Sequence, residues 1–270
     1  LDGNGQDDFV KILAGVQEAH GGTTEVLDVD ENFIKYNSLE SAKLNGISFV
    51  SGDRKKEGIL PNLSIYENLV VPLYKKTSRA GFLGFIDWLE LNGIFDWEVD
   101  RLSIKTGPRD NLIGSLSGGN QQKVMIARSF AQHPKVLILN DPARGIDVST
   151  KRDLYVHLRN YVEEGNTVVF LSSELEEFIG LCPKVMVFRN GTVFDIFENE
   201  KINADTLLEG MFGQTAGISE TFLSSKSNSN STTTEKKSVT NKKIENKKIV
   251  KVVDFEKENK NKTKIKIKTF

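Results

Sequence analysis

The sequence predicts an α/β fold in which helices cover a mainly parallel central sheet on both faces. Three observations support this prediction. Short apolar runs recur in the first 213 residues, segments of helical character separate them, and the runs at 136–139 and 168–172 are apolar at successive rather than alternate positions. Strands that are buried on both faces have this composition, and they are typical of parallel sheets between two layers of helices.

The predicted elements follow one another up to about residue 213. The first helix comes directly after a glycine-rich turn, and Asn190 and Gly191 form a turn signal between the last two strands. Helices are expected at 9–13, 68–100, 121–132 and 151–163, and strands at 25–30, 46–50, 136–139, 168–172, 185–189 and 192–197. We interpret the aromatic residues of the second helical stretch as packing residues, namely Phe82, Phe85, Trp88, Phe95 and Trp97.

Composition excludes several classes of protein. A single cysteine among 270 residues excludes a disulfide framework or a cysteine-rich metal site. No apolar run approaches the roughly 18–20 residues that cross a bilayer, and no signal-peptide pattern opens the sequence. We therefore expect a soluble cytoplasmic protein. The hydrophobic fraction of 38% is low, which indicates that part of the chain does not join a core.

Residues 214–270 differ from the rest in charge. They carry 14 lysines and 6 acidic residues, a balance of +8. Residues 222–248 are too polar to compensate for the entropy of ordering, so we expect a disordered tail rich in Lys, Asn and Ser. The end of the tail, 262–270, alternates Lys with Ile; it is either a strand that pairs with a partner or, as we favour, a solvated segment. Without interleaved aromatic residues, the tail predicts no specific nucleic-acid partner.

The first six residues form a glycine-rich turn, and a doubly wound sheet needs a strand that leads into such a turn. We therefore expect the chain to be the C-terminal portion of a longer protein.

Two segments carry the chemistry. At 116–123, Ser117 precedes two adjacent glycines that open directly into a helix. Such a start exposes backbone N–H groups at the positive end of the helix dipole and binds anions such as phosphate, although the bare pattern also fits an ordinary capped helix. The strand at 136–139 ends in Asn140 and Asp141, and α/β sheets hold ligands at the carboxyl ends of their strands.

Residues 115–147 resemble the signature motif, Walker B strand and D-loop of the ATPases of ATP-binding-cassette (ABC) transporters. The stretches 53–58, 116–123 and 172–175 more narrowly resemble the second cassette of duplicated sugar-importer ATPases of the ribose, galactose and xylose type. The likeness covers about residues 1–213. It implies a P-loop NTPase-like ABC domain at 1–213, with a helical subdomain at about 64–130.

The resemblance implies roles for the signature segment. In this family two cassettes pair head to tail, and each ATP lies between the phosphate loop of one and the signature of the other. Asp147 would lie in the contact between cassettes, and residues 64–100 would touch a membrane permease. The signature residues that would bind the partner's nucleotide are Ser117, Gly118, Gly119, Asn120 and Gln121.

The chain's own phosphate loop departs from the pattern G-x-x-x-x-G-K-[ST]. Gly3, Asn4 and Gly5 fit, but Gln6 stands at the lysine position, and Asp7 and Asp8 stand at the hydroxyl positions. Each carboxylate would repel a phosphate charge by about 3–4 kcal/mol at ~5 Å and an effective dielectric of about 20. We hypothesise that these carboxylates supply the negative charge that a phosphate supplies in active relatives. A second interpretation, compatible with the first, is that they stabilise the helix dipole.

The remaining positions are also degenerate. By resemblance, Asn140 replaces the Asp that orders Mg²⁺, and Asp141 replaces the catalytic Glu. Gly52 stands at the position of a sensor glutamine, and Ser173 at that of the switch histidine. Hydrolysis by this half is therefore doubtful. The charged run 53–57 is either a solvated loop or a contact with the permease.

These patterns predict the C-terminal cassette of the ATP-binding subunit of an importer for simple sugars, peripheral on the cytoplasmic face of the membrane. The intact protein would couple ATP binding and hydrolysis to uptake. The expected cofactors are ATP and Mg²⁺, and the expected partners are a second cassette in the same subunit or a homodimer, a permease and, indirectly, a sugar-binding protein. Two alternatives remain: a permease-docking module with no part in ATP turnover, and a soluble cassette protein that acts on ribosomes or DNA.

Overall fold

A parallel three-stranded sheet lies at the centre of the computed structural model, which describes residues 3–28, 32–74, 86–212, 249–251 and 265–268. The sheet has the order β3 (Ile47–Val50), β4 (Val136–Asn140), β5 (Thr167–Leu171). In register, Val50 lies opposite Leu139, and Leu139 lies opposite Phe170, so the carboxyl ends of the three strands meet at one edge. The predicted fold class, α/β with a parallel central sheet and helices, is confirmed.

Helices cover both faces of this sheet, as the sequence predicts. Val136 and Ile138 of β4 pack with α1 (Gln6–Leu13), α2 (Leu39–Leu44) and β1 (Thr23–Leu27). Leu137 and Leu139 of the same strand face the opposite layer, which contains α5 (Gly118–Phe130) and α6 (Val148–Glu163). The alternation explains why all five residues of β4 are buried.

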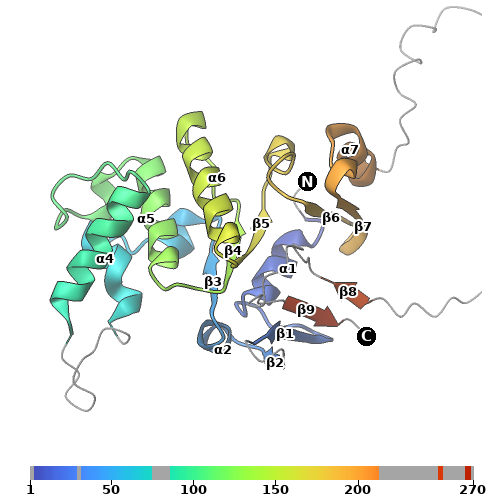
Figure 1. The fold of residues 1–270 in the computed structure, drawn as a ribbon, viewed down its shortest axis with the longest axis horizontal. Helices are drawn as coiled ribbons and strands as arrows, with labels where there is room; N and C mark the ends of the chain where they lie inside the picture. The colour runs from blue at the N-terminus through green and yellow to red at the C-terminus, as the bar shows by residue number, and fades with distance from the viewer. Residues whose placement is uncertain (1–2, 29–31, 75–85, 213–248, 252–264, 269–270) are drawn as a thin grey trace, which may run out of the picture.

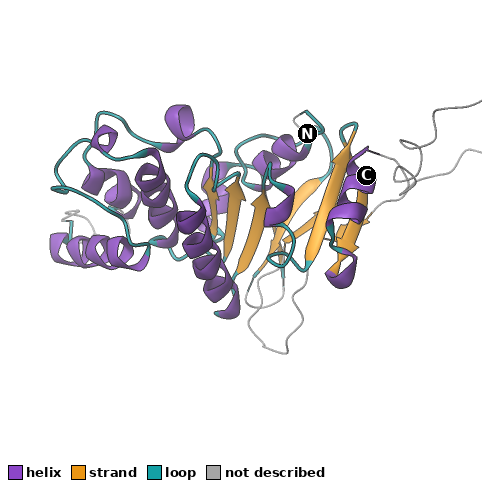
Figure 2. Ribbon diagram, turned by 90° about the horizontal axis from the view of Figure 1, so that it is seen from above, coloured by secondary structure: helices purple, strands orange, loops and turns teal. Residues whose placement is uncertain are grey.

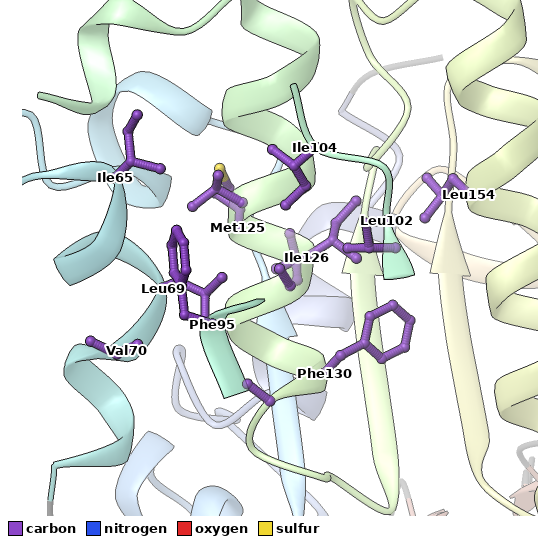
Figure 3. Packing of buried hydrophobic residues seen from close by; sticks show 14 of the residues in the cluster. Ile65, Leu69, Val70, Phe95, Leu102, Ile104, Met125, Ile126, Phe130 and Leu154 are labelled. Carbon is purple, nitrogen blue, oxygen red and sulfur yellow. The ribbon is translucent and has the colours of Figure 1, made fainter. Parts of the chain in front are cut away.

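A helical region forms one end of the molecule (Figure 1). It contains α3 (Ile65–Val70) and α4 (Trp88–Arg101), which pack on α5. Figure 3 shows side chains of α5, among them Met125 and Ile126, meeting Leu69 of α3 and Phe95 of α4 in a buried hydrophobic cluster. The cluster fixes the position of α5, whose amino end carries the predicted signature residues.

Within the helical stretch predicted at 68–100, the described residues form the end of α3, a 3₁₀ turn that contains Pro72 (η2, Val71–Leu73) and ends this helix, and α4. Phe82 and Phe85 lie outside the described residues. Phe95 is buried as predicted, but Trp88 and Trp97 are 54% and 67% exposed, so the packing interpretation is wrong for these two.

The opposite end of the molecule holds a hairpin of β6 (Lys184–Arg189) and β7 (Thr192–Glu198), with α7 (Ala204–Phe212) packed against it (Figure 2). Asn190 and Gly191 make the predicted turn, both with positive φ, as a two-residue hairpin with Asn-Gly requires. The expectation that β6 and β5 are strands buried on both faces is corrected. In the described part of the chain β6 pairs only with β7, antiparallel, and every residue of β5 is half-buried.

A second, antiparallel sheet contains, in this order, β2 (Phe33–Tyr36), β1, β9 (Ile265–Lys268) and β8 (Ile249–Lys251). The strand expected at 25–30 is β1, which begins at Thr23 and ends at Leu27. The last part of the chain supplies β9, which pairs with β1 and corrects the expectation of a solvated segment at Ile265–Lys268.

Among the described residues, further short helical segments connect these elements: a π-helix η1 (Arg54–Gly58) and 3₁₀ turns η4 (Ile113–Ser115), η5 (Leu175–Glu177) and η6 (Asn199–Lys201). Within the described ranges, no helix combines the length and the apolar character that crossing a membrane requires.

Candidate functional site

Most of the sequence-predicted site residues gather at the carboxyl edge of the parallel sheet. Asn140 ends β4, Asp141 follows it, Gly52 follows β3, and Ser173 follows β5. Helix α1 packs against β4 and β5 and begins at the same edge. The parallel register therefore brings together positions that lie more than 130 residues apart in sequence.

The predicted phosphate loop is a glycine-rich turn at the start of α1. Gly3 and Gly5 have φ angles of 83° and 92°, in the left-handed region that glycine adopts without a steric cost. Asn4 anchors the turn to the β6–β7 hairpin, since its backbone O accepts from Gly191 N at 3.1 Å and its Oδ1 accepts from Asn190 N at 3.1 Å. Gln6 is the first residue of the helix.

The carboxylate of Asp7 is occupied by two partners from the protein itself. Asn140 Nδ2 donates to Asp7 Oδ1 at 2.6 Å, and Lys11 Nζ lies 2.8 Å from Asp7 Oδ2. Burial raises the pKa of Asp7, but the hydrogen bonds from Lys11 and Asn140 outweigh it, so the pKa lies below its ordinary value. The hydrogen bond to Asp7 in turn raises the pKa of Lys11. Asp8, the other carboxylate of this turn, is exposed.

Sequence reasoning missed Lys11, although its spacing of four residues from Asp7 on one helix was a usable signal. Lys11 brings a positive charge to the phosphate loop, but its ion pair with Asp7 neutralises this charge. The Asp7 carboxylate is therefore paired within the domain, whereas no side chain caps the amides at the start of α1.

The two residues at the expected catalytic positions contact each other. Ser173 Oγ donates to Asp141 Oδ2 at 3.0 Å, and Ser173 N donates to Asp141 Oδ1 at 3.4 Å. Asp141 has a φ of 47°, a left-handed conformation that is unusual for a non-glycine residue, and its N donates to Leu171 O at 2.7 Å. The backbone thus aims the carboxylate at the end of β5.

Gly52 leaves little room for a side chain. A Cβ at this position would lie 3.0 Å from the backbone O of Asn140. A larger residue at position 52, such as the sensor glutamine that the resemblance expects, would require the backbone at Asn140 to shift by a few tenths of an ångström.

The predicted signature residues lie at the start of α5, with Ser117 as the N-cap. Ser117 is exposed, and its Oγ accepts from Asn120 Nδ2 at 3.1 Å. Gly118 and Gly119 are the first two residues of the helix, where N–H groups have no intrahelical acceptor, and neither amide donates to another described residue. No acidic residue lies in this first turn.

Asn120 and Gln121, also predicted to bind nucleotide, use their side chains within the domain. Asn120 Oδ1 accepts from Lys105 N at 3.0 Å, and Gln121 Nε2 donates to Leu116 O at 3.0 Å. These bonds hold the loop ahead of the helix and tie both side chains to the domain itself.

The charged run 53–57 is solvated as expected at all positions but Arg54, yet it is helical rather than a loop, because residues 54–58 form the π-helix η1. Arg54 Nη1 donates to Gly118 O at 3.0 Å. Farther along η1, Arg128 donates to Gly58 O, and a Cβ at Gly58 would lie only 2.3 Å from Met125 Cε. Sequence reasoning singled out this run but missed the contact between Arg54 and the signature glycine.

Asp147 caps its own helix, α6. Its carboxylate accepts from Ser149 Oγ at 2.6 Å, from Thr150 N at 3.0 Å and from Thr150 Oγ1 at 2.8 Å. These bonds, the one from Ser149 first, hold the pKa of Asp147 well below its ordinary value. The residue is therefore a charged cap at an exposed helix start.

Comparison with known families identifies the class of protein. The profile of the family described as "ABC transporter" matches residues 2–144. The chain belongs to this family.

The most similar curated relatives include ribose import proteins. The chain is 36% identical to "Ribose import ATP-binding protein RbsA 1" of Rhizobium johnstonii over 211 residues, which are 77% of this chain and 40% of the relative. It is 30% identical to "Ribose import ATP-binding protein RbsA" of Geobacillus kaustophilus over 213 residues, which are 79% of this chain and 42% of the relative. The chain thus spans about two fifths of these relatives' length.

Among solved structures, the dimeric structure of MJ0796, a bacterial ABC transporter cassette, matches with a TM-score of 0.62 at 22% identity, over 73% of this chain and 82% of that one. The ATP-binding cassette MJ1267 matches with a TM-score of 0.61 at 19% identity, over 77% and 84% of the two chains. At this level of identity, the likeness shows the fold.

Proposed function

We propose that this chain is the C-terminal cassette of the ATP-binding subunit of a sugar importer, and that its signature segment completes an ATP site on a partner cassette. The observation that carries the proposal is the open start of α5. Ser117 is exposed, the amides of Gly118 and Gly119 have no acceptor among the described residues, and no acid lies in the first turn. A hydroxyl and two amides at a helix start match phosphate oxygens. The relatives named for ribose import support a sugar as the cargo. The dimeric cassette among the solved structures supports a second cassette as the partner.

The residues of the chain's own phosphate loop do not fit ATP and Mg²⁺. Gln6 carries no charge, and Asp7 offers a carboxylate, already paired with Lys11 and Asn140, where a phosphate-binding loop needs a hydroxyl. Asn140 is a neutral ligand at the position of a metal-ordering carboxylate. The proposal therefore places ATP and Mg²⁺ on the partner's loop, and this chain's own site takes no part in hydrolysis.

Exposed apolar side chains on α4 support docking of a membrane permease on the helical region, which we place at about 64–130. Trp88, Leu89 and Trp97 are 54%, 81% and 67% exposed. Because η1 is fixed to α5 through Arg54 and Gly58, a permease that moves η1 would also move the signature. Such a cassette, at residues 1–213, works at the cytoplasmic face of the membrane and serves a sugar-binding protein indirectly.

Reconstitution of ATP turnover tests the proposal. The purified chain is mixed with a first cassette that has an intact phosphate loop, and we expect it to raise the rate of ATP hydrolysis. Ser117→Arg should abolish the increase by filling the open helix start. Ser38→Arg is the matched control, since Ser38 is also an exposed N-cap serine, on α2, and should leave the increase unchanged. An increase that Ser117→Arg does not alter would contradict the proposal.

The paired carboxylate of Asp7 at the start of α1 favours one alternative, a docking module with no part in ATP turnover. That function predicts no increase in turnover at any ratio of the two proteins, together with binding to permease-containing membranes.

A further inference from the structure

A buried ion pair joins the start of α6 to the segment that follows β5, the strand beside this helix (Figure 1). Lys151 Nζ lies 3.0 Å from Glu177 Oε1, and the side chains of these two residues are 15% and 5% exposed. The other oxygen of the Glu177 carboxylate accepts a hydrogen bond from Ser172 Oγ. Lys151 also donates to the exposed carboxylate of Glu174. One cation of α6 therefore holds two carboxylates and, through Glu177, the residue that follows β5.

The burial of this pair makes it a rigid connection. Burial lowers the pKa of Lys151, but the hydrogen bonds to Glu174 and Glu177 outweigh it, so the pKa lies above its ordinary value and the side chain is charged at neutral pH. A buried carboxylate that has lost its cation is strongly unfavourable, whereas an exposed pair contributes little. The pair of Lys151 with Glu177 therefore fixes the start of α6 relative to the end of β5.

The start of α6 reaches the signature segment through Ile146. A Cβ built on Gly119 would lie 3.6 Å from Ile146 Cγ2, an ordinary contact distance. Ile146 directly precedes Asp147, the N-cap of α6, and Lys151 N donates to Asp147 O at 3.0 Å in the first turn. A displacement of this turn would therefore move Ile146 relative to the start of α5.

In the other direction, the ion pair reaches the edge of the parallel sheet. Ser172 is followed directly by Ser173, whose Oγ donates to Asp141 Oδ2 at 3.0 Å. Glu174 N donates to Ser172 Oγ at 2.9 Å, so the backbone after β5 turns around this hydroxyl. Lys151 thus connects two features that are distant in sequence, the signature start and the residues at the expected catalytic positions.

We propose that Lys151 is a positioning residue for the signature. Its pair with Glu177 fixes the first turn of α6 and, through Ile146, the geometry of the open amides at the start of α5. The inference rests on the proposed function, because it deepens the role that we give to these amides. Lys151 acts through Ile146 rather than by contact with nucleotide. Its loss should therefore lower kcat and leave KM for ATP, which the partner's loop binds, nearly unchanged.

The test combines reconstituted ATP turnover with a measurement on the chain alone. Lys151→Met removes the cation. The double variant Lys151→Met/Glu177→Gln also removes the buried charge, so an unpaired carboxylate cannot cause its effects. Lys151→Arg keeps a cation, and Arg152→Met, at the exposed next position of α6, is the matched control. Two-dimensional NMR follows the amide signals of Gly118 and Gly119 in the absence of a partner, and urea denaturation confirms that each variant is folded.

We expect Lys151→Met and the double variant to lower kcat about fivefold at unchanged KM for ATP and to shift both amide signals. Lys151→Arg and Arg152→Met should behave like the parent. Parental turnover and unmoved amide signals in the folded double variant would overturn the inference. So would a fall in kcat without a shift of the signals, since Lys151 would then act elsewhere. If the parent itself gives no increase in turnover, the proposed function fails, and the amide signals alone decide: shifted signals support the positioning role, and unmoved signals overturn it.

Discussion

The starts of α1 and α5 make an instructive comparison, because both follow glycines and both are predicted to meet a phosphate. At α1 the first turn contains Asp7, which Lys11 and Asn140 bind at 2.8 and 2.6 Å. At α5 the first turn holds no acid, and the amides of Gly118 and Gly119 have no acceptor among the described residues. The two helices therefore differ in what occupies the first turn. Two glycine-rich starts, both predicted to meet a phosphate, thus differ in the charges beside them.

The largest effect is expected when α5 is made to resemble α1. Gly119→Asp places a carboxylate in the first turn, where the phosphate would sit, and should reduce reconstituted ATP turnover about 100-fold or more. The variant should fold, since a Cβ at Gly119 lies 3.6 Å from its nearest neighbour, an ordinary contact. Gly114→Asp, where a Cβ meets nothing within 4 Å, is the control and should retain turnover. Retained turnover in Gly119→Asp would contradict the claim that an acid in the first turn distinguishes α1 from α5.

The next effect concerns Glu98, a buried residue of α4, the helix that packs on α5. This residue is 1% exposed, and burial raises the pKa of its carboxyl to about 7 from the ordinary 4.5, partly offset by Arg101 at 3.4 Å. The folded state binds this proton more tightly than the unfolded state. Its stabilising effect is therefore complete below pH 4.5 and is lost as the pH rises through 7, by about 3 kcal/mol.

Glu98→Gln should remove that loss, so the variant should be more stable than the parent at pH 8 and similar to it below pH 4.5. Urea denaturation at both pH values measures the difference. The exposed Glu90→Gln on the same helix serves as control and should keep the parent's pH dependence. An unchanged pH dependence in Glu98→Gln would show that its carboxyl is not the titrating group.

A smaller effect is expected at Arg54, which positions the signature through Gly118 O at 3.0 Å. Arg54→Met should lower the kcat of reconstituted turnover about fivefold, the cost of one hydrogen bond, and leave KM for ATP nearly unchanged. Lys56→Met is the control, since the side chain of Lys56 is 85% exposed. A change confined to KM would argue that Arg54 contacts nucleotide directly.

The smallest effect belongs to the ion pair of α1. Asp7 is half-exposed, so Asp7→Asn should cost less than about 1 kcal/mol at pH 7. Because the folded-state pKa of Asp7 is lowered, the difference is present above pH 3.8 and should disappear as the pH falls below it. Thermal unfolding at several pH values measures it, with Asp8→Asn as the control for the helix dipole. A larger cost at low pH than at neutral pH would contradict the assigned direction.

Elements with strong local signals were predictable from the sequence. The apolar run at 136–139 is β4, and the helices expected at 121–132 and 151–163 are α5 and α6. Each of these helices begins three residues earlier than expected, since Ser117 and Asp147 act as N-caps. Capping residues therefore mark these starts better than the first apolar residue does.

Features that depend on partners distant in sequence were not predictable. The sequence placed β6 correctly but not its pairing, because periodicity does not identify a neighbour. It named Asp141 and Ser173 separately, and only the parallel register of β4 and β5 brings them together. Lys11 and Arg54 were missed as site residues because their significance lies in what they contact. The roles of residues 117–119 and 147 toward another cassette remain predictions.

The most direct test of the central claim measures hydrogen exchange at the amides of Gly118 and Gly119. The chain is combined with a first cassette that binds a non-hydrolysable ATP analogue, and exchange is compared with and without the nucleotide. Our account predicts that both amides become protected only when nucleotide and partner are present together. Exchange that stays fast in the nucleotide-bound assembly, while the partner's phosphate loop is protected, would contradict it.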